Sequence, residues 1–180
     1  MTAEHFVAER PKSDEYNIYY DRYISLVQGR DVLAALEAEH KKTLDLLGAK
    51  SEADGDLRYA PDKWSVKEVL GHMVDTERIM SYRALRIARN DKTPIEGYEQ
   101  DDYIKYGPFR HCRLADLSAE FSQVRAATLS LFRGLDAEHW TRRGTANKFD
   151  ISVRALAFVI AGHEVHHRSI LEQKYFSGTR

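Results

Sequence analysis

The chain has 180 residues, of which 43% are apolar, and its 27 Lys and Arg nearly balance 28 Asp and Glu, which leaves a net charge of −1. This charge excludes the basic surface expected of a protein that binds nucleic acid or an anionic membrane. The longest uninterrupted apolar run, 155–161, is shorter than the ~20 residues of a membrane span, and a single cysteine, Cys112, excludes an intrachain disulfide and a CxxC motif.

The size and composition predict one globular domain over residues 1–180, with a core at about 31–175 and an N-terminal arm at 1–30. The opening segment contains no hydrophobic stretch that would suit a signal peptide. Together with the sparse use of cysteine, this favours a soluble protein in the cytoplasm.

The first strong helical pattern runs from Asp31 to Leu47, with Asp31 as the N-cap and Gly48 as the stop. The segment before it, residues 15–28, is rich in tyrosine. It forms either a short helix or an arm laid across the bundle, and the pattern favours neither.

A second helix is predicted to begin after Ser65, because Ser65 and Glu68 have the spacing of a reciprocal capping box, and to end near Ala88. A long connection follows from 90 to 113 and contains several aromatic residues. Connections of this length are often lids or binding loops, so a functional loop is predicted here.

The remainder of the chain predicts a third helix at 114–132, a single turn at 136–140, a loop at 144–150 and a fourth helix at 152–173. No segment shows the alternation of a strand. Four amphipathic helices without strands predict an all-α fold, a four-helix bundle.

Two histidines of the last helix, His163 and His167, are four residues apart on one stripe, which consists of Leu156, Ile160, His163, His167, Ile170 and Lys174. Imidazoles one turn apart on one helix face are able to converge on a single cation. A hydrogen-bonded core pair or a surface pair has the same spacing, and these alternatives stay open. His166 falls at the edge of the stripe.

His72 is the best candidate for a third ligand, because it lies at the border of the apolar face of the second helix, where a side chain reaches a helix interface. Three neutral imidazoles suit Zn, Ni, Fe or Cu better than Mg or Ca, and they leave coordination positions for water or substrate. Such an open site is typical of catalysis.

Three charged residues near these histidines have two interpretations each. Asp75 either orients an imidazole and accepts a proton or is a solvated helix residue. For Arg83, a salt bridge within the bundle is favoured over binding of an anionic substrate, and Glu164 is expected at the surface or against a neighbouring helix. The remaining histidines are expected to be structural or solvated: His5, His40, His111 and His139.

The chain contains two motifs. The first is Trp64-Ser65-x-x-Glu68-x-x-x-His72-x-x-Asp75-x-Glu77-Arg78, followed by Tyr82-Arg83. The second, near the C-terminus, is Gly162-His163-Glu164-x-His166-His167. Their combination and order resemble the DinB/YfiT-like superfamily over about residues 31–175. The resemblance implies an up-down-down-up four-helix bundle, often a homodimer, in which three histidines hold a divalent metal. By position these ligands are His72, His163 and His167.

The superfamily includes bacillithiol S-transferases, mycothiol-dependent maleylpyruvate isomerases and the metal domain of ergothioneine-forming enzymes. The resemblance therefore implies a metal-dependent enzyme, with Zn or Ni as the metal, that transfers a low-molecular-weight thiol as cosubstrate to an electrophilic small molecule. Asp75 is the candidate catalytic residue. A metal-dependent hydrolase and a non-catalytic metal-binding or ligand-binding bundle are the alternatives. No nucleic-acid or membrane partner is expected.

Overall fold

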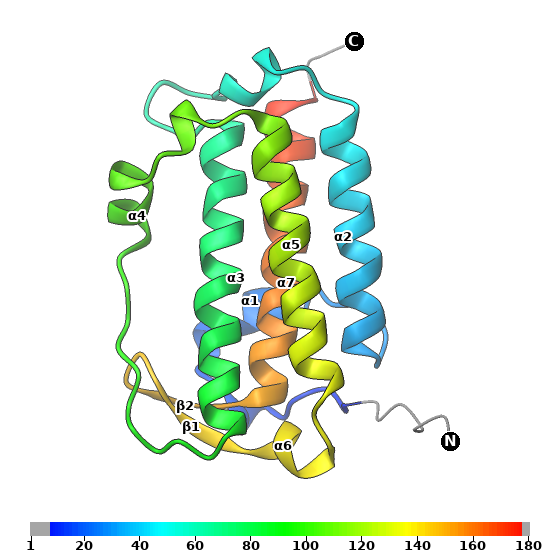
Figure 1. The fold of residues 1–180 in the computed structure, drawn as a ribbon, viewed down its shortest axis with the longest axis vertical. Coiled ribbons are helices and arrows are strands. Elements are labelled where there is room, and N and C mark those ends of the chain that lie inside the picture. Colours follow the sequence, from blue (N-terminus) through cyan, green and yellow to red (C-terminus); the bar gives the residue numbers. More distant parts are fainter. Residues whose placement is uncertain (1–7, 178–180) are drawn as a thin grey trace.

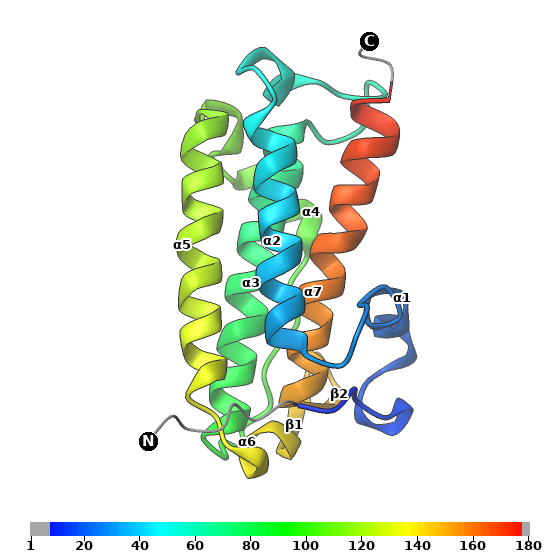
Figure 2. The same ribbon diagram turned by 90° about the vertical axis from the view of Figure 1, so that its right-hand side faces the viewer.

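Four long helices lie side by side in the computed structural model, which describes residues 8–177. Their bounds are Val32–Gly48 for α2, Val66–Ala88 for α3, Leu114–Arg133 for α5 and Val153–Ile170 for α7. The helices α2 and α7 run in one direction, and α3 and α5 run in the other (Figure 1, Figure 2). This up-down-down-up order confirms the predicted four-helix bundle.

Shorter elements connect and cover the bundle: η1 (Ser13–Glu15), η2 (Ile18–Tyr20), α1 (Asp21–Ile24), η3 (Ala53–Asp56), α4 (Gln100–Tyr106), η4 (Phe109–His111), α6 (Ala137–Thr141), β1 (Arg143–Ala146), β2 (Phe149–Ser152) and η5 (Leu171–Tyr175). Within residues 8–177, no helix combines the length and the apolar composition that crossing a bilayer requires.

The beginnings of three long helices follow from local chemistry. The carboxylate of Asp31 accepts hydrogen bonds from the first N–H groups of α2, and the hydroxyl of Ser152 does the same for α7. At the start of α3, Ser65 and Glu68 form the predicted reciprocal capping box. Each cap satisfies backbone donors that have no partner within the helix, so these predicted starts are confirmed.

The predicted loop at 144–150 is wrong, because these residues form an antiparallel hairpin in which Gly144 faces Ile151. The two turn residues, Asn147 and Lys148, both have positive φ, at 50° and 69°. Two successive residues of positive φ give the backbone twist that joins adjacent antiparallel strands. The hairpin escapes detection because each strand has only four residues and the turn lacks glycine.

The connection between α3 and α5 runs along the bundle from one end to the other, since these two helices are parallel (Figure 1). It contains α4 and η4, which the sequence did not predict. Its first part is fastened to the hairpin: the N–H of Ile95 donates to the carbonyl of Thr145, and the N–H of Asn147 donates to the carbonyl of Ile95. The connection thus covers one side of the bundle.

The tyrosine-rich segment forms short turns and the single turn α1, which packs against α7 (Figure 2). It is therefore an arm across the bundle rather than a continuous helix.

The interior consists of two apolar clusters with a polar layer between them. One cluster contains Leu36, Phe132 and Phe158 and fills the end near the hairpin, and the other contains Leu70 and Phe121 and fills the opposite end. Buried polar residues occupy the helix positions between the clusters: Thr43, His72, Thr76, Glu77, Arg125, Thr128, His163 and Glu164. Because buried polar groups are costly without partners, this layer is where a functional site is expected.

Candidate metal centre

Three imidazoles converge in the polar layer. His72 comes from α3, and His163 and His167 come from consecutive turns of α7, which packs against α3. The Nε2 atom of His163 lies 3.0 Å from Nε2 of His72 and 3.1 Å from Nε2 of His167. All three nitrogens lie within 4.8 Å of one another. The structure therefore brings together the three histidines that the sequence selected.

The environment keeps these imidazoles neutral. His72 and His163 are 4% and 6% exposed. Burial, assisted by the neighbouring histidines, lowers the pKa of His72 to about 4 and the pKa values of His163 and His167 well below their usual range. A neutral imidazole offers a nitrogen lone pair, which is the form that binds a metal.

The geometry of the nitrogens fits one metal ion. Two imidazole nitrogens at about 2.0–2.1 Å from a common ion and 90–109° apart lie roughly 2.8–3.4 Å from each other. The two Nε2 separations that involve His163 fall within this range. A set of three imidazoles suits a first-row transition ion and leaves further coordination positions open.

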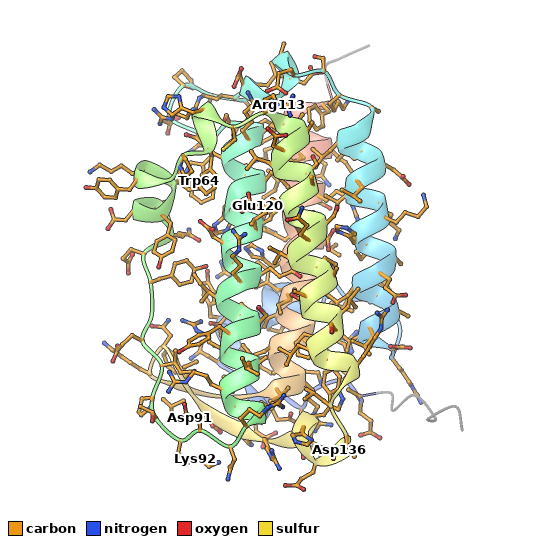
Figure 3. The ribbon with its side chains drawn as sticks, viewed as in Figure 1. Trp64, Asp91, Lys92, Arg113, Glu120 and Asp136 are labelled. Atoms are coloured by element: carbon orange, nitrogen blue, oxygen red, sulfur yellow. The ribbon has the colours of Figure 1, made fainter. Side chains whose placement is uncertain are left out.

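Neighbouring side chains support the His72 ring. Trp64 lies just before α3, on the side of α4 (Figure 3). The centroid of its indole ring is 4.9 Å from the centroid of the His72 ring. The hydroxyl of Thr76 lies 3.5 Å from Nδ1 of His72 and 2.9 Å from the hydroxyl of Tyr98. Sequence reasoning missed both hydroxyls, although Thr76 follows His72 by one helical turn. Tyr98 belongs to the long connection and gives no local signal.

Two cavities adjoin the histidine cluster. One, of about 260 Å³, is lined by His72 and His163 together with Tyr23, Arg83 and Tyr98. The other, of about 330 Å³, is lined by His167, Trp64 and Tyr175. Different histidines of the cluster thus border two spaces that are large enough for small molecules.

Gly162 explains how the arm comes so close to the cluster. A Cβ atom at this position would lie 2.0 Å from the carbonyl oxygen of Tyr23. Because glycine leaves that space free, α1 packs directly on α7. The centroid of the Tyr23 ring then lies 5.2 Å from the centroid of the His163 ring.

Gly162→Ala is expected to lower the free energy of unfolding by about 1–3 kcal/mol, because the arm has to move away from α7. Urea denaturation followed by circular dichroism measures the change. Gly48→Ala is the matched control, since a Cβ there meets nothing within 4 Å, and its effect should stay below about 0.5 kcal/mol. Equal stabilities of the two variants would contradict the packing argument.

Asp75 lies on α3, where its carboxylate is 3.8 Å from Nη1 of Arg78. Burial raises the pKa of Asp75. Arg78 also pairs with Glu120, which lies at the boundary of α3 and α5 (Figure 3). Asp75 forms no hydrogen bond to a histidine among the described residues, and it lines neither cavity beside the cluster. Its catalytic role stays a prediction.

The favoured interpretation of Arg83 is wrong. Arg83 is 2% exposed, but in the described part of the chain it pairs with none of the carboxylates, and its guanidinium instead donates to the carbonyl of Glu96 at 2.9 Å. For Glu164, the expected contact with a neighbouring helix is confirmed. Its carboxylate forms an ion pair of 2.7 Å with Arg125 of α5.

The other histidines stay outside the cluster. The ring of His166 packs against Tyr23 and is partly exposed. His40 packs against Phe121, and burial lowers its pKa to about 4. His139 contacts the carboxylate of Asp136 on α6, and His111 is exposed on η4. His5 lies outside the residues that the structure describes.

Comparisons with known proteins agree with this fold. The family model of the DinB superfamily matches residues 35–171. Among solved structures, YfiT from Bacillus subtilis is similar with a TM-score of 0.64 and 16% sequence identity, over 92% of this chain and 93% of that chain. YfiT is described as a probable metal-dependent hydrolase with an unusual four-helix bundle topology. None of the curated proteins matches the sequence.

Proposed function

We propose, from the premise that this chain belongs to the DinB superfamily, that it is a metal-dependent enzyme that transfers a low-molecular-weight thiol to an electrophilic small molecule. The observation that carries the proposal is the convergence of three buried Nε2 atoms on one point. When bound there, a divalent ion such as Zn or Ni supplies Lewis-acid chemistry, which lowers the pKa of a coordinated water or thiol.

The protein's own residues position the reactants. His72, His163 and His167 hold the ion through neutral nitrogens, and Trp64 and Thr76 fix the orientation of the His72 ring by packing and by a polar contact. The ring of Tyr23 packs edge-on against the His163 ring and restricts its movement. These contacts favour a preorganised site.

The two cavities favour a reaction of two substrates. Each adjoins a different part of the histidine cluster, so a thiol and an electrophile have separate places beside the same ion. Cys112 lines neither of these cavities, and its thiol donates to the carbonyl of Pro108. The sulfur that reacts therefore comes from a cosubstrate.

Hydrolysis is the second candidate, because the structurally similar YfiT is described as a probable metal-dependent hydrolase. In that reaction water takes the place of the thiol, and Asp75 is the candidate proton acceptor. Its carboxyl has a raised pKa through burial, which is a property of general bases that work near neutral pH.

A turnover screen separates these chemistries. Protein purified without a His tag, loaded with zinc or nickel, is expected to conjugate one of bacillithiol, mycothiol, glutathione or coenzyme A to an electrophile such as monobromobimane, and chelation should abolish the reaction. Ester or amide cleavage without any thiol would instead support the hydrolase, in which case Asp75→Asn should lower kcat. A zinc-loaded protein that turns over neither substrate class would contradict both and leave a metal-binding bundle.

The homodimer that the resemblance implies and a cytoplasmic location also belong to the proposal. Sedimentation equilibrium of the metal-loaded protein tests the first, with a mass of twice 20.8 kDa as the expected result. A monomer mass would contradict it.

A further inference from the structure

Arg83 is a buried cation on the wall of the cavity that His72 and His163 also line. One hydrogen bond, from Nη2 to the carbonyl of Glu96, joins it to an oxygen acceptor at 2.9 Å. Its Nη1 atom lies 3.6 Å from the sulfur of Met80, which is a weak acceptor, and its Nε atom has no partner. The uncharged hydroxyl of Tyr20 also contacts the guanidinium.

Arg125 is a second buried arginine, and it has a purely structural role with which Arg83 can be compared. Arg125 is 1% exposed and donates two hydrogen bonds of 2.8 Å to the carboxylate of Glu77. The carboxylate of Glu164 lies 2.7 Å from its Nη1 atom. Burial of a charge is costly unless it is paired, and Arg125 has two anionic partners. Arg83 is equally buried, but its partners in the described residues are all neutral.

The cavity walls indicate which anion would complete the pairing. Tyr19, Tyr23 and Tyr98 supply aromatic surface, and two acidic residues, Glu99 and Asp101, lie on the same cavity. Two carboxylates on the wall of a cavity that holds a single arginine disfavour a phosphate dianion through repulsion. They are compatible with a singly charged carboxylate, whose planar oxygens match the guanidinium fork.

The cavity also sets the shape of the ligand. The wall contributed by α3 consists of His72, Thr76, Met80 and Arg83, which lie on one face of that helix. His72 and Arg83 are 11 residues apart, which corresponds to about 16 Å along the helix axis, part of which the long arginine side chain spans. A molecule that touches both ends is elongated, with its acid group distant from the atom near the histidines.

We propose that Arg83 binds the carboxylate of the substrate, and that the substrate is therefore an elongated carboxylic acid with its reactive group at the end opposite the acid. The inference rests on the proposed function for the identity of the reacting end. The binding of the carboxylate by Arg83 is a separate property of this cavity and is measured separately.

The test uses hexanoate as the probe, hexanamide as its neutral counterpart and butyl phosphate as the dianion. Calorimetric titration of the zinc-loaded protein is expected to give a hexanoate affinity about tenfold or more above that of hexanamide, because a charge-assisted hydrogen bond is lost in the amide. In ¹H–¹⁵N spectra, hexanoate should shift the Nε–H resonance of Arg83. Arg83→Met should lower hexanoate affinity by about tenfold or more, and Arg83→Lys by less.

Arg89→Met is the matched control, since Arg89 is an exposed residue at the end of the same helix and the substitution removes the same charge. Its hexanoate affinity should stay within about twofold of the parent protein, because an exposed and distant charge is screened by salt. The ¹H–¹⁵N spectra are recorded on the parent protein, so they test the proposal even if Arg83→Met fails to fold.

Several results would overturn the inference. They are an unmoved Arg83 resonance, equal affinities for hexanoate and hexanamide, tighter binding of butyl phosphate, or hexanoate affinity unchanged in Arg83→Met. The last result would mean that the carboxylate binds the ion alone. Zinc content measured on the same samples separates the two proposals: full zinc occupancy without Arg83-dependent binding overturns only this inference. Arg83-dependent binding without zinc overturns only the metal-dependent function.

Discussion

His163→Ala is expected to abolish stoichiometric binding of zinc or nickel. The Nε2 atom of His163 is the one that approaches both other nitrogens, at 3.0 and 3.1 Å, so its removal leaves only two of the three nitrogens to hold an ion. Loss of a group that only orients a ligand costs about 10–100-fold in metal affinity, and loss of a ligand should exceed that. Metal content after dialysis and competition with a chelator measure the effect.

His166→Ala is the matched control for this experiment. His166 lies on the same turns of α7, and its ring is 5.0 Å from that of His167, but it is not one of the three converging ligands. It should keep its metal. Full occupancy in His163→Ala, or equal loss in both variants, would show that the cluster does not hold the ion. His72→Ala and His167→Ala should behave like His163→Ala.

Arg125→Leu is expected to have the largest effect on stability, about 3–5 kcal/mol in the free energy of unfolding. The substitution leaves the carboxylates of Glu77 and Glu164 buried without their cation, at positions that are 3% and 2% exposed. It also removes the donor to the carbonyl of Leu36. Urea or thermal denaturation of the metal-free protein measures the loss without a contribution from bound ion.

The stability of this variant should depend on pH. Burial raises the pKa of Glu164, and Arg125 opposes that rise, so removal of Arg125 raises the pKa further. A carboxyl with a raised pKa binds more protons in the folded state than in the unfolded state, so stability falls as pH increases above the ordinary value of 4.5. The loss in Arg125→Leu is therefore expected to be larger at pH 8 than at pH 5.

Arg133→Leu provides the comparison on the same helix. Arg133 also forms an interhelical ion pair, with Glu37, but both side chains are about half exposed. An exposed pair contributes roughly 0–1 kcal/mol, so the variant should lose little stability. Similar losses in the two variants, or a loss in Arg125→Leu that does not change with pH, would contradict the account of the buried ion network.

The starts of the helices and the three converging histidines were predictable from the sequence because they depend on nearby residues. The caps Asp31, Ser65 and Ser152 act on N–H groups within three positions. Asp31 and Ser65 were predicted as caps, and the last helix begins near Ser152 as predicted. His163 and His167 share a face because of helical periodicity. Recognition of His72 as their partner came from its place at a helix border, supported by the family resemblance.

The partners of the two buried arginines could not be predicted from the sequence. Arg125 pairs with a carboxylate 48 residues away, whereas Arg83 has no anionic partner among the described residues, and nothing in the sequence near either residue distinguishes them. The bridge between Ile95 of the long connection and Ala146 of the hairpin is likewise a contact between segments about 50 residues apart. Such features follow from which surfaces meet when the helices pack.

Local sequence thus determines the four helices and places three histidines on facing surfaces, since capping and periodicity act within one or two turns. The approach of Tyr23 to Gly162 and the cavity that holds Arg83 beside His72 and His163 arise only when distant segments pack together. The reason is physical: burial and the pairing of charge depend on neighbours that tertiary contacts supply.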